Sequence, residues 1–254
     1  MRHGTVRIDD DGQITRLTMD RPEKRNALSI ELMEELTAAL RSATGRVVVL
    51  AGAGPCFSAG HDLGEIAEGD TAAHVRVFET CTTLMEAVQA ISQPVIAEVH
   101  GVATAAGCQL VASCDLAVAE AGARFGTPGV KIGLFCSTPM VPLSRSIGPK
   151  RAMQMLLTGE LISADVAADW GLVNTVVAAE DLGATVAALA DQVAAASPLT
   201  LAIGKRTFHR QLGLDQRQAY DLAAASMVAN AATADAKEGI DAFLTKRSPT
   251  WTGT

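Results

Sequence analysis

The sequence contains few aromatic residues and no regular pattern of cysteine or histidine. Phe, Trp and Tyr make up only 4% of the 254 residues, which leaves few platforms for stacking on single-stranded nucleic acid. The five cysteines form no CxxC pair and their number is odd, so a disulfide scaffold or a structural zinc site is not expected. No HExxH motif occurs either. We therefore expect no metal site.

An excess of positive charge and long apolar runs are also missing. The formal net charge is −7, which argues against general binding to nucleic-acid phosphates. Apolar stretches are short and broken by Gly, Pro or charge, so none is expected to span a bilayer. Residues 1–13 have no apolar signal-peptide core. We expect a cytoplasmic protein that binds neither nucleic acid nor membranes.

Strand and helix patterns alternate over most of the chain. Apolar residues are 48% of the total and charged residues 19%, enough to bury a substantial core. Alternating strands and helices indicate an α/β core at residues 1–196, and an Ala-rich sequence predicts a helical region at residues 197–254. The predicted strands lie at 6–8, 14–19, 46–50, 95–99, 115–119 and 173–177, and the predicted helices lie between a Ser29 cap and Gly45, at 71–91 and at 105–113.

Two strand-to-helix junctions consist largely of small residues, at 56–63 and at 100–109. Small residues let a ligand approach the backbone, and a helix N-terminus offers free N–H groups. Two such junctions aimed at one point would form an oxyanion hole from backbone amides. The alternative is that both are tight turns that only pack a strand against a helix, and spacing alone favours it.

A third Gly-rich segment, residues 51–54, does not fit a nucleotide-binding loop. No Gly-Lys-Ser/Thr follows it, so it is not a phosphate-binding loop of that kind. It also does not complete a GxGxxG motif opening a helix. A nicotinamide-dependent dehydrogenase is therefore disfavoured.

Several short motifs follow one another in a fixed order along nearly the whole chain. The motifs are Phe57-Ser58-Ala59-Gly60-His61-Asp62-Leu63, Gly107-Cys108-Gln109-Leu110, Cys114-Asp115-Leu116-Ala117, Phe125-Gly126-Thr127-Pro128, and residues 157–164, 170–174 and 242–247. Through them the chain resembles the crotonase superfamily, the enoyl-CoA hydratase/isomerase family. Residues 103–109 and 133–139 most resemble its branch called enoyl-CoA hydratase domain-containing.

The resemblance implies a fold and a ligand. The implied core is a spiral of repeated ββα units, followed by a C-terminal helical region that forms trimers or hexamers made of two trimers. The implied ligand is a coenzyme A thioester, bound as substrate with no separate cofactor. An enzyme that follows the family name would be a lyase or isomerase of fatty acid metabolism.

The resemblance also assigns two backbone N–H groups to an oxyanion hole, those of His61 and Ala106. Ala106 stands where the family usually has Gly, which is tolerable if φ there is negative. The side chain of His61 is expected to be a bystander at the pocket rim, with a catalytic role as the alternative because histidine titrates near neutrality.

Coenzyme A contacts are implied at both ends of the chain. A Lys near a phosphate is a sensible point charge, although Lys246 would also suit a solvated helix end. Phe243 and Lys246 match a pair that commonly reaches the nucleotide from a neighbouring subunit. The full set is Lys24, Arg25, Ala27, Ala59, Gly60, His61, Asp62, Leu63, Phe243 and Lys246.

Two positions depart from the hydratase pattern. A hydratase needs one carboxylate to deprotonate water and another to protonate the α-carbon, and here these positions carry Gln109 and Gly129. An amide orients water but cannot take its proton. Each lost general acid or base costs about a hundred- to ten-thousand-fold in rate, so we do not expect efficient hydration.

Other reactions stay open for such a site. A cavity that stabilises an enolate suits decarboxylation, because the substrate then supplies its own leaving group. Isomerisation or thioester cleavage would need another base, for which Cys136 and Ser137 are candidates; the favoured alternative is that both line the pocket without chemistry. Glu65 and Glu68 lie near the first junction, with a solvated helix face as their expected role. The second hypothesis is a catalytically silent acyl-CoA binder.

Overall fold

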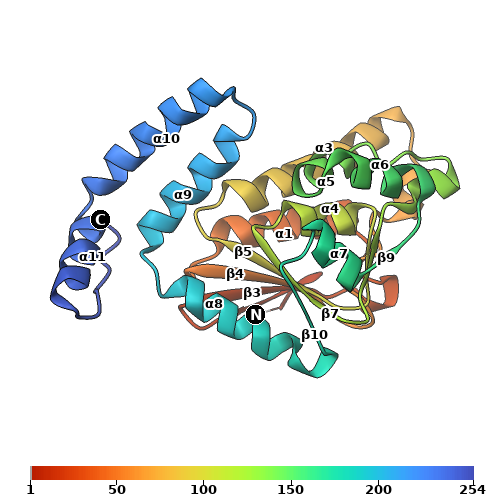
Figure 1. The fold of residues 1–254 in the computed structure, drawn as a ribbon. Helices are drawn as coiled ribbons and strands as arrows, with labels where there is room; N and C mark the ends of the chain where they lie inside the picture. The colour runs from red at the N-terminus through yellow and green to blue at the C-terminus, as the bar shows by residue number, and fades with distance from the viewer. Residues whose placement is uncertain (1) are drawn as a thin grey trace.

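The computed structural model describes residues 2–254, and the side chains of residues 4–254. The chain forms a mixed α/β core, and three C-terminal helices extend away from it (Figure 1). The bulk of the chain therefore surrounds the sheets, as the alternating sequence pattern predicts.

A seven-stranded sheet forms the centre of the core, in the order β1-β2-β3-β4-β5-β7-β10. The first three strands are antiparallel, and the neighbours from β3 onward are parallel. The first five residues of β4 are buried, as expected of a parallel strand covered on both faces. The strands are β1 (Arg2–His3), β2 (Val6–Asp10), β3 (Ile14–Met19), β4 (Val47–Gly52), β5 (Val95–Val99), β7 (Leu116–Glu120) and β10 (Thr175–Val177).

A second sheet of three short strands contains β6 (Val102–Thr104), β8 (Arg124–Gly126) and β9 (Ile162–Ser163). The chain passes from β5 to β6 and then into helix α4 (Ala106–Ser113), and later from β7 to β8. This winding between two sheets is the predicted ββα spiral. Single parallel bridges join Ser58 to Ala103 and Leu28 to His61. Successive turns of the spiral therefore lie side by side, which brings the two junctions together.

Helices cover both faces of the large sheet. One core cluster packs α1 and α3 against it, and a smaller cluster packs α8 against the opposite face. Ser29 caps α1, because its side chain accepts a hydrogen bond from the N–H of Leu32. The helices are α1 (Ile30–Ser42), α2 (Leu63–Ala67), α3 (Thr71–Ala90), α4, α5 (Met140–Ser146), α6 (Pro149–Thr158), α7 (Ala164–Trp170), α8 (Leu182–Ala194), α9 (Pro198–Gln211), α10 (Gln216–Ala231) and α11 (Ala234–Thr245).

Most predicted elements are confirmed, with shifted ends. The strand predicted at 46–50 is β4 and continues to Gly52, so it includes the first two residues of the Gly-rich segment 51–54. The helix predicted from Ala105 begins at Ala106, because Ala105 has φ 49° and ψ −118°, which is not helical. The strand predicted at 173–177 covers only 175–177.

The division predicted between residues 196 and 197 falls in the turn between α8 and α9. Ser197 caps α9 by accepting a hydrogen bond from the N–H of Thr200. Within residues 2–254, no single helix has the length and apolar composition to cross a membrane. The segments Ala179–Ala194 and Pro198–Gln211 meet those criteria only as a pair, which is bent by 101°.

Candidate active site

A cavity of about 690 Å³ lies where the two junctions meet. Mostly apolar side chains line it, from the first junction, α2, α3, the start of α4 and the loop before α5. The lining includes nine of the residues that the sequence singled out, namely Ala27, Ala59, His61, Asp62, Leu63, Ala106, Gly129, Cys136 and Ser137. The spiral therefore gathers segments far apart in sequence around one space.

Backbone hydrogen bonds hold the two junctions against each other. The N–H of Ser58 donates to the carbonyl of Val102 at 3.1 Å, and the N–H of Thr104 donates back to Ser58 at 3.0 Å. Gly107 is required by this close approach, because a Cβ there would collide with the carbonyl oxygen of Ser58. The buried Asn26 side chain also donates to the carbonyls of Ala53 and Cys56, which fixes the start of the first junction.

Two backbone N–H groups at the cavity wall lack an acceptor. Those of His61 and Ala106 donate none of the hydrogen bonds found within residues 2–254. Ala106 is the first residue of α4 and is not among the residues with positive φ, so alanine is tolerated there. The residue with the strained, positive φ is Ala105. Gly60, at φ 94°, keeps the space beside the Ala106 nitrogen open, because a Cβ there would lie 3.3 Å from it.

The side chain of Gln109 is buried one turn into α4, with 4% of its surface exposed. Its Oε1 accepts a hydrogen bond from the Sγ of Cys81, at 3.8 Å. Burial raises the pKa of Cys81 to about 12. This thiol therefore stays protonated and acts as the donor in the hydrogen bond to Gln109. The amide is thus held by α3 and offers no group that could deprotonate water.

Gly129 has no room for a side chain. A Cβ there would collide with the carbonyl oxygen of Leu134 and lie 2.8 Å from the Sγ of Cys136. Burial also raises the pKa of Cys136, which opposes the thiolate that a nucleophile needs. The Ser137 hydroxyl donates to the carbonyl of Phe135 at 3.3 Å. The geometry therefore favours the interpretation in which Cys136 and Ser137 line the pocket without chemistry.

The imidazole of His61 packs edge-to-face on Phe78 of α3, with ring centroids 5.5 Å apart. Both of its nitrogens are buried without a hydrogen-bond partner. Burial lowers the pKa of His61, so the ring is neutral at pH 7. This side chain is half-buried in the cavity wall, and both of its nitrogens are shielded from solvent.

The sequence matches a known protein family over nearly its whole length. The family model described as enoyl-CoA hydratase/isomerase matches residues 9–254. The chain belongs to the enoyl-CoA hydratase/isomerase family. Both the predicted superfamily and its enoyl-CoA hydratase domain-containing branch are confirmed by the relatives that follow.

Members of the enoyl-CoA hydratase/isomerase family match along almost the whole chain. The mitochondrial enoyl-CoA hydratase domain-containing protein 3 of Mus musculus is 44% identical over 94% of this chain and 81% of its own. The 2,3-dehydroadipyl-CoA hydratase of Escherichia coli is 39% identical, over 93% of this chain and 94% of its own. Relatives named as mitochondrial do not establish the predicted cytoplasmic location.

Solved structures from the enoyl-CoA hydratase/isomerase family share the fold. An enoyl-CoA hydratase of Mycobacterium smegmatis has a TM-score of 0.95 and 45% identity, over 98% of this chain and 99% of that chain. The human enoyl-CoA hydratase domain-containing protein 3 has a TM-score of 0.93 and 42% identity, over 97% of this chain and 100% of that chain. The predicted crotonase fold is therefore confirmed.

Five of the residues predicted to contact coenzyme A do not line the cavity within one chain, namely Lys24, Arg25, Gly60, Phe243 and Lys246. Lys24 and Arg25 are exposed beside Ala27, and the carbonyl of Arg25 accepts a hydrogen bond from Ala59 at 3.0 Å. Phe243 is 84% exposed. Phe243 and Lys246 lie at the end of α11, on the other side of the molecule from α5 and α6 (Figure 1).

Glu65 is not a freely solvated side chain, because it accepts a hydrogen bond from the N–H of Ile30 at 3.0 Å.

The sequence did not single out the apolar walls of the cavity. Phe78 belongs to the periodic pattern of the 71–91 helix, which gives no sign of which members face a ligand. In the loop between Pro128 and α5, the sequence singled out Gly129, Cys136 and Ser137 but not their neighbours, because the loop has no periodicity. The lining residues missed in this way include Ile66, Phe78, Lys131, Ile132, Leu134, Phe135 and Thr138.

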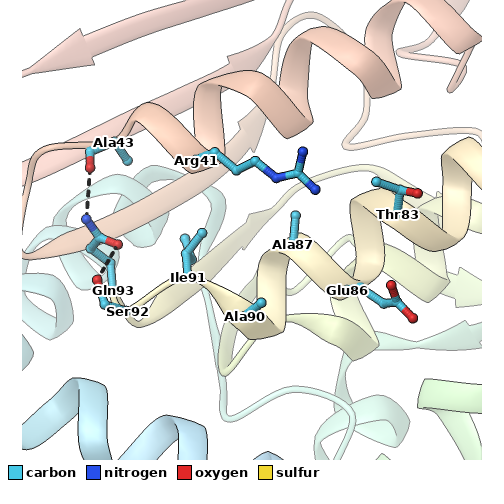
Figure 2. Close-up of a pocket in the computed structure, with 9 residues that line it drawn as sticks. All are labelled: Arg41, Ala43, Thr83, Glu86, Ala87, Ala90, Ile91, Ser92 and Gln93. Carbon is cyan, nitrogen blue, oxygen red and sulfur yellow. Dashed lines mark hydrogen bonds between the residues drawn. The ribbon is translucent and has the colours of Figure 1, made fainter.

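Figure 2 shows a different cavity, of about 540 Å³, between the end of α1 and α3. The side chain of Gln93 donates to the carbonyl of Ala43 at 2.9 Å and accepts from Ser92 at 3.0 Å. Arg41 and Glu86 are the charged residues that line this cavity. It contains none of the residues that carry the family resemblance. We therefore place the candidate active site in the first cavity.

Proposed function

We propose that the chain binds an acyl-coenzyme A thioester with its acyl group in the 690 Å³ cavity. The thioester oxygen would lie between the N–H groups of His61 and Ala106. The observation that carries this proposal is the pair of amides without acceptors at the wall of a largely apolar cavity. Membership of the enoyl-CoA hydratase/isomerase family supports it.

Such a site stabilises an enolate. Preorganised amides favour negative charge on the thioester oxygen, and one such donor is worth about 3 kcal/mol of transition-state stabilisation. No group of three or more His, Cys, Asp or Glu within the described residues could hold a metal. We propose that the reaction needs no cofactor beyond the thioester itself.

The reaction we favour is one in which the substrate supplies its own leaving group. The Escherichia coli relative is named a hydratase, but here Gln109 cannot act as a base and Gly129 has no space for an acid. Loss of carbon dioxide from a malonyl-type thioester would need only the oxyanion hole and a proton for the resulting enolate.

A catalytically silent acyl-CoA binder is the second candidate. The crowding around Gly129 favours it, because the space of a missing carboxylate is filled by Leu134 and Cys136. Turnover of any thioester in a broad panel would exclude this candidate.

We also propose that the functional unit is a homotrimer or a hexamer. Apolar side chains are exposed on all three C-terminal helices, including Phe208 of α9, Val228 of α10 and Phe243 of α11. A neighbouring subunit would then bring its own Phe243 and Lys246 to the coenzyme.

The proposed binding is tested by comparing two ligands in isothermal titration calorimetry. Butyryl-CoA has the thioester carbonyl, and S-butyl-CoA is the matched thioether without it. We expect butyryl-CoA to bind about tenfold more tightly, which corresponds to about 1.4 kcal/mol. Equal affinities would refute the oxyanion hole, and no binding of either ligand would refute the coenzyme A site.

A further inference from the structure

We propose that Phe78 of α3 limits the length of the acyl group that the candidate active site accepts. The cavity ends at this ring, and a longer chain would have to displace it. The site is therefore selective for short-chain thioesters. This inference deepens the proposed binding of coenzyme A thioesters and rests on it.

Phe78 stands between two cavities. Besides the 690 Å³ cavity of the candidate active site, a cavity of about 640 Å³ lies along α3. All residues that line this second cavity belong to α3, between Thr71 and Thr83, and several of them are exposed. Among the described residues, Phe78 alone lines both cavities. Its ring therefore separates the space proposed for the acyl group from a second space that opens to solvent.

Contacts on both sides hold this partition in place. The half-buried ring of Phe78 packs against the main core cluster. It also packs edge-to-face on His61, with ring centroids 5.5 Å apart and an angle of 87° between the planes, a geometry that aromatic pairs prefer. Beside it, a ring N–H of His74 donates to the carbonyl of Ile66 at 2.8 Å, which ties α2 to α3. Moving Phe78 to admit a chain would break the contact with His61, so the closed arrangement is favoured.

The partition lies close to the proposed oxyanion hole. His61 supplies both the backbone N–H proposed for the thioester oxygen and the ring that contacts Phe78. One histidine side chain and one ring contact therefore span the space between the thioester carbonyl and Phe78. Only a short acyl group fits between them.

The second cavity offers little to a longer chain as long as Phe78 is in place. His74, Glu79 and Thr82 are among its lining residues, and Val75 is its other apolar side chain besides Phe78. A methylene group gains about fourfold in affinity when it is buried against apolar atoms, and one that stays in water gains nothing. For the wild-type protein, affinity should therefore stop rising with chain length once the chain reaches Phe78.

The test is isothermal titration calorimetry with butyryl-CoA and octanoyl-CoA. In the wild-type protein, octanoyl-CoA should bind no more tightly than butyryl-CoA. F78A joins the two cavities, and octanoyl-CoA should then bind about tenfold more tightly than butyryl-CoA, because its additional methylenes become partly buried. A merely structural role for Phe78 would weaken both ligands and leave their ratio unchanged.

V75A is the matched control for F78A. Val75 lies one turn before Phe78 on α3, is 49% exposed, and lines the second cavity but not the first. The substitution therefore removes an apolar side chain from the same helix and leaves the partition intact. V75A should keep the wild-type ratio of the two affinities.

The outcomes separate this inference from the proposal beneath it. If neither thioester binds the wild-type protein, the coenzyme A site itself is wrong. If butyryl-CoA binds but octanoyl-CoA binds about tenfold more tightly to the wild type, or if F78A keeps the wild-type ratio, the role of Phe78 is refuted while the site stands. Should F78A not fold, F78L decides, because its smaller side chain opens part of the partition and should raise the ratio about threefold; an unchanged ratio would overturn the inference.

Discussion

At the scale of single residues, the cavity differs from a hydratase site through the space around Gly129. The loop backbone at Leu134 and the thiol of Cys136 fill the place where a side chain would begin. A carboxylate side chain, which the resemblance to hydratases implies at this position, would not fit the surrounding loop. Adding a carboxylate at this position alone would strain the loop before it could act.

We predict that G129A lowers the free energy of unfolding by about 1 to 3 kcal/mol, because a tightly packed site must move to admit a methyl group. Urea denaturation measures this change. The control is G183A, since Gly183 is exposed in α8 with nothing within 4 Å of its Cβ position; it should gain about 0.5 to 1 kcal/mol from helix propensity. If G129A were as stable as the wild type, the loop would be open and the crowding argument would fail.

At the scale of elements, a buried lysine fixes helix α9 to the core. The Nζ of Lys205 lies 2.7 Å from a carboxylate oxygen of Asp115 and donates to the carbonyls of Val88 and Gln93 at 2.7 and 2.8 Å. The other carboxylate oxygen of Asp115 lies 3.1 Å from the ring of His209. One cation thus joins the end of α3, the start of β7 and α9.

We predict that K205M destabilises the fold by about 3 kcal/mol, because removing one partner leaves a largely buried carboxylate without its cation. Urea denaturation gives the magnitude, and hydrogen exchange should show the largest loss of protection in α9. K150M is the matched control, since Lys150 is exposed in α6; it should change stability by less than about 0.5 kcal/mol. An equal effect of both substitutions would contradict the docking role.

The elements could be predicted from the sequence where a local signal sets them. The Asp10-Asp11-Gly12 turn and the Ser29 cap are such signals, and the elements beside them lie where predicted. The small sheet could not be predicted, because strands of two or three residues are too short to show periodicity. The family motifs located nine of the cavity residues, but the crowding at Gly129 and the unpaired ring of His61 arise from tertiary contacts with the loop and with α3.

At the scale of the whole molecule, the C-terminal helices expose more apolar surface than a monomer needs. Val228 is 73% exposed and Phe243 84% exposed. Contiguous exposed apolar patches mark interaction surfaces in soluble proteins. The shape in Figure 1, with α10 and α11 standing away from the core, leaves this surface free to meet other copies of the chain.

We predict that light scattering after gel filtration gives the mass of three or six chains. V228E should shift the protein toward smaller species, because the charge would be buried at the contact. V141E is the control, since Val141 is exposed in α5 on the other side of the molecule, and it should keep the wild-type mass. A wild-type monomer at micromolar concentration would refute both the assembly and the contribution of Phe243 and Lys246 from a neighbour.

We propose that this cavity binds coenzyme A thioesters without the carboxylates of a hydratase. The most direct measurement is steady-state hydration of crotonyl-CoA by the wild-type protein, followed by loss of the enoyl thioester absorbance. Because we assign Gln109 and Gly129 to the positions of the two hydratase carboxylates, we predict no turnover above background. Rapid turnover would contradict the claim, and would show that another group in the cavity acts as the base.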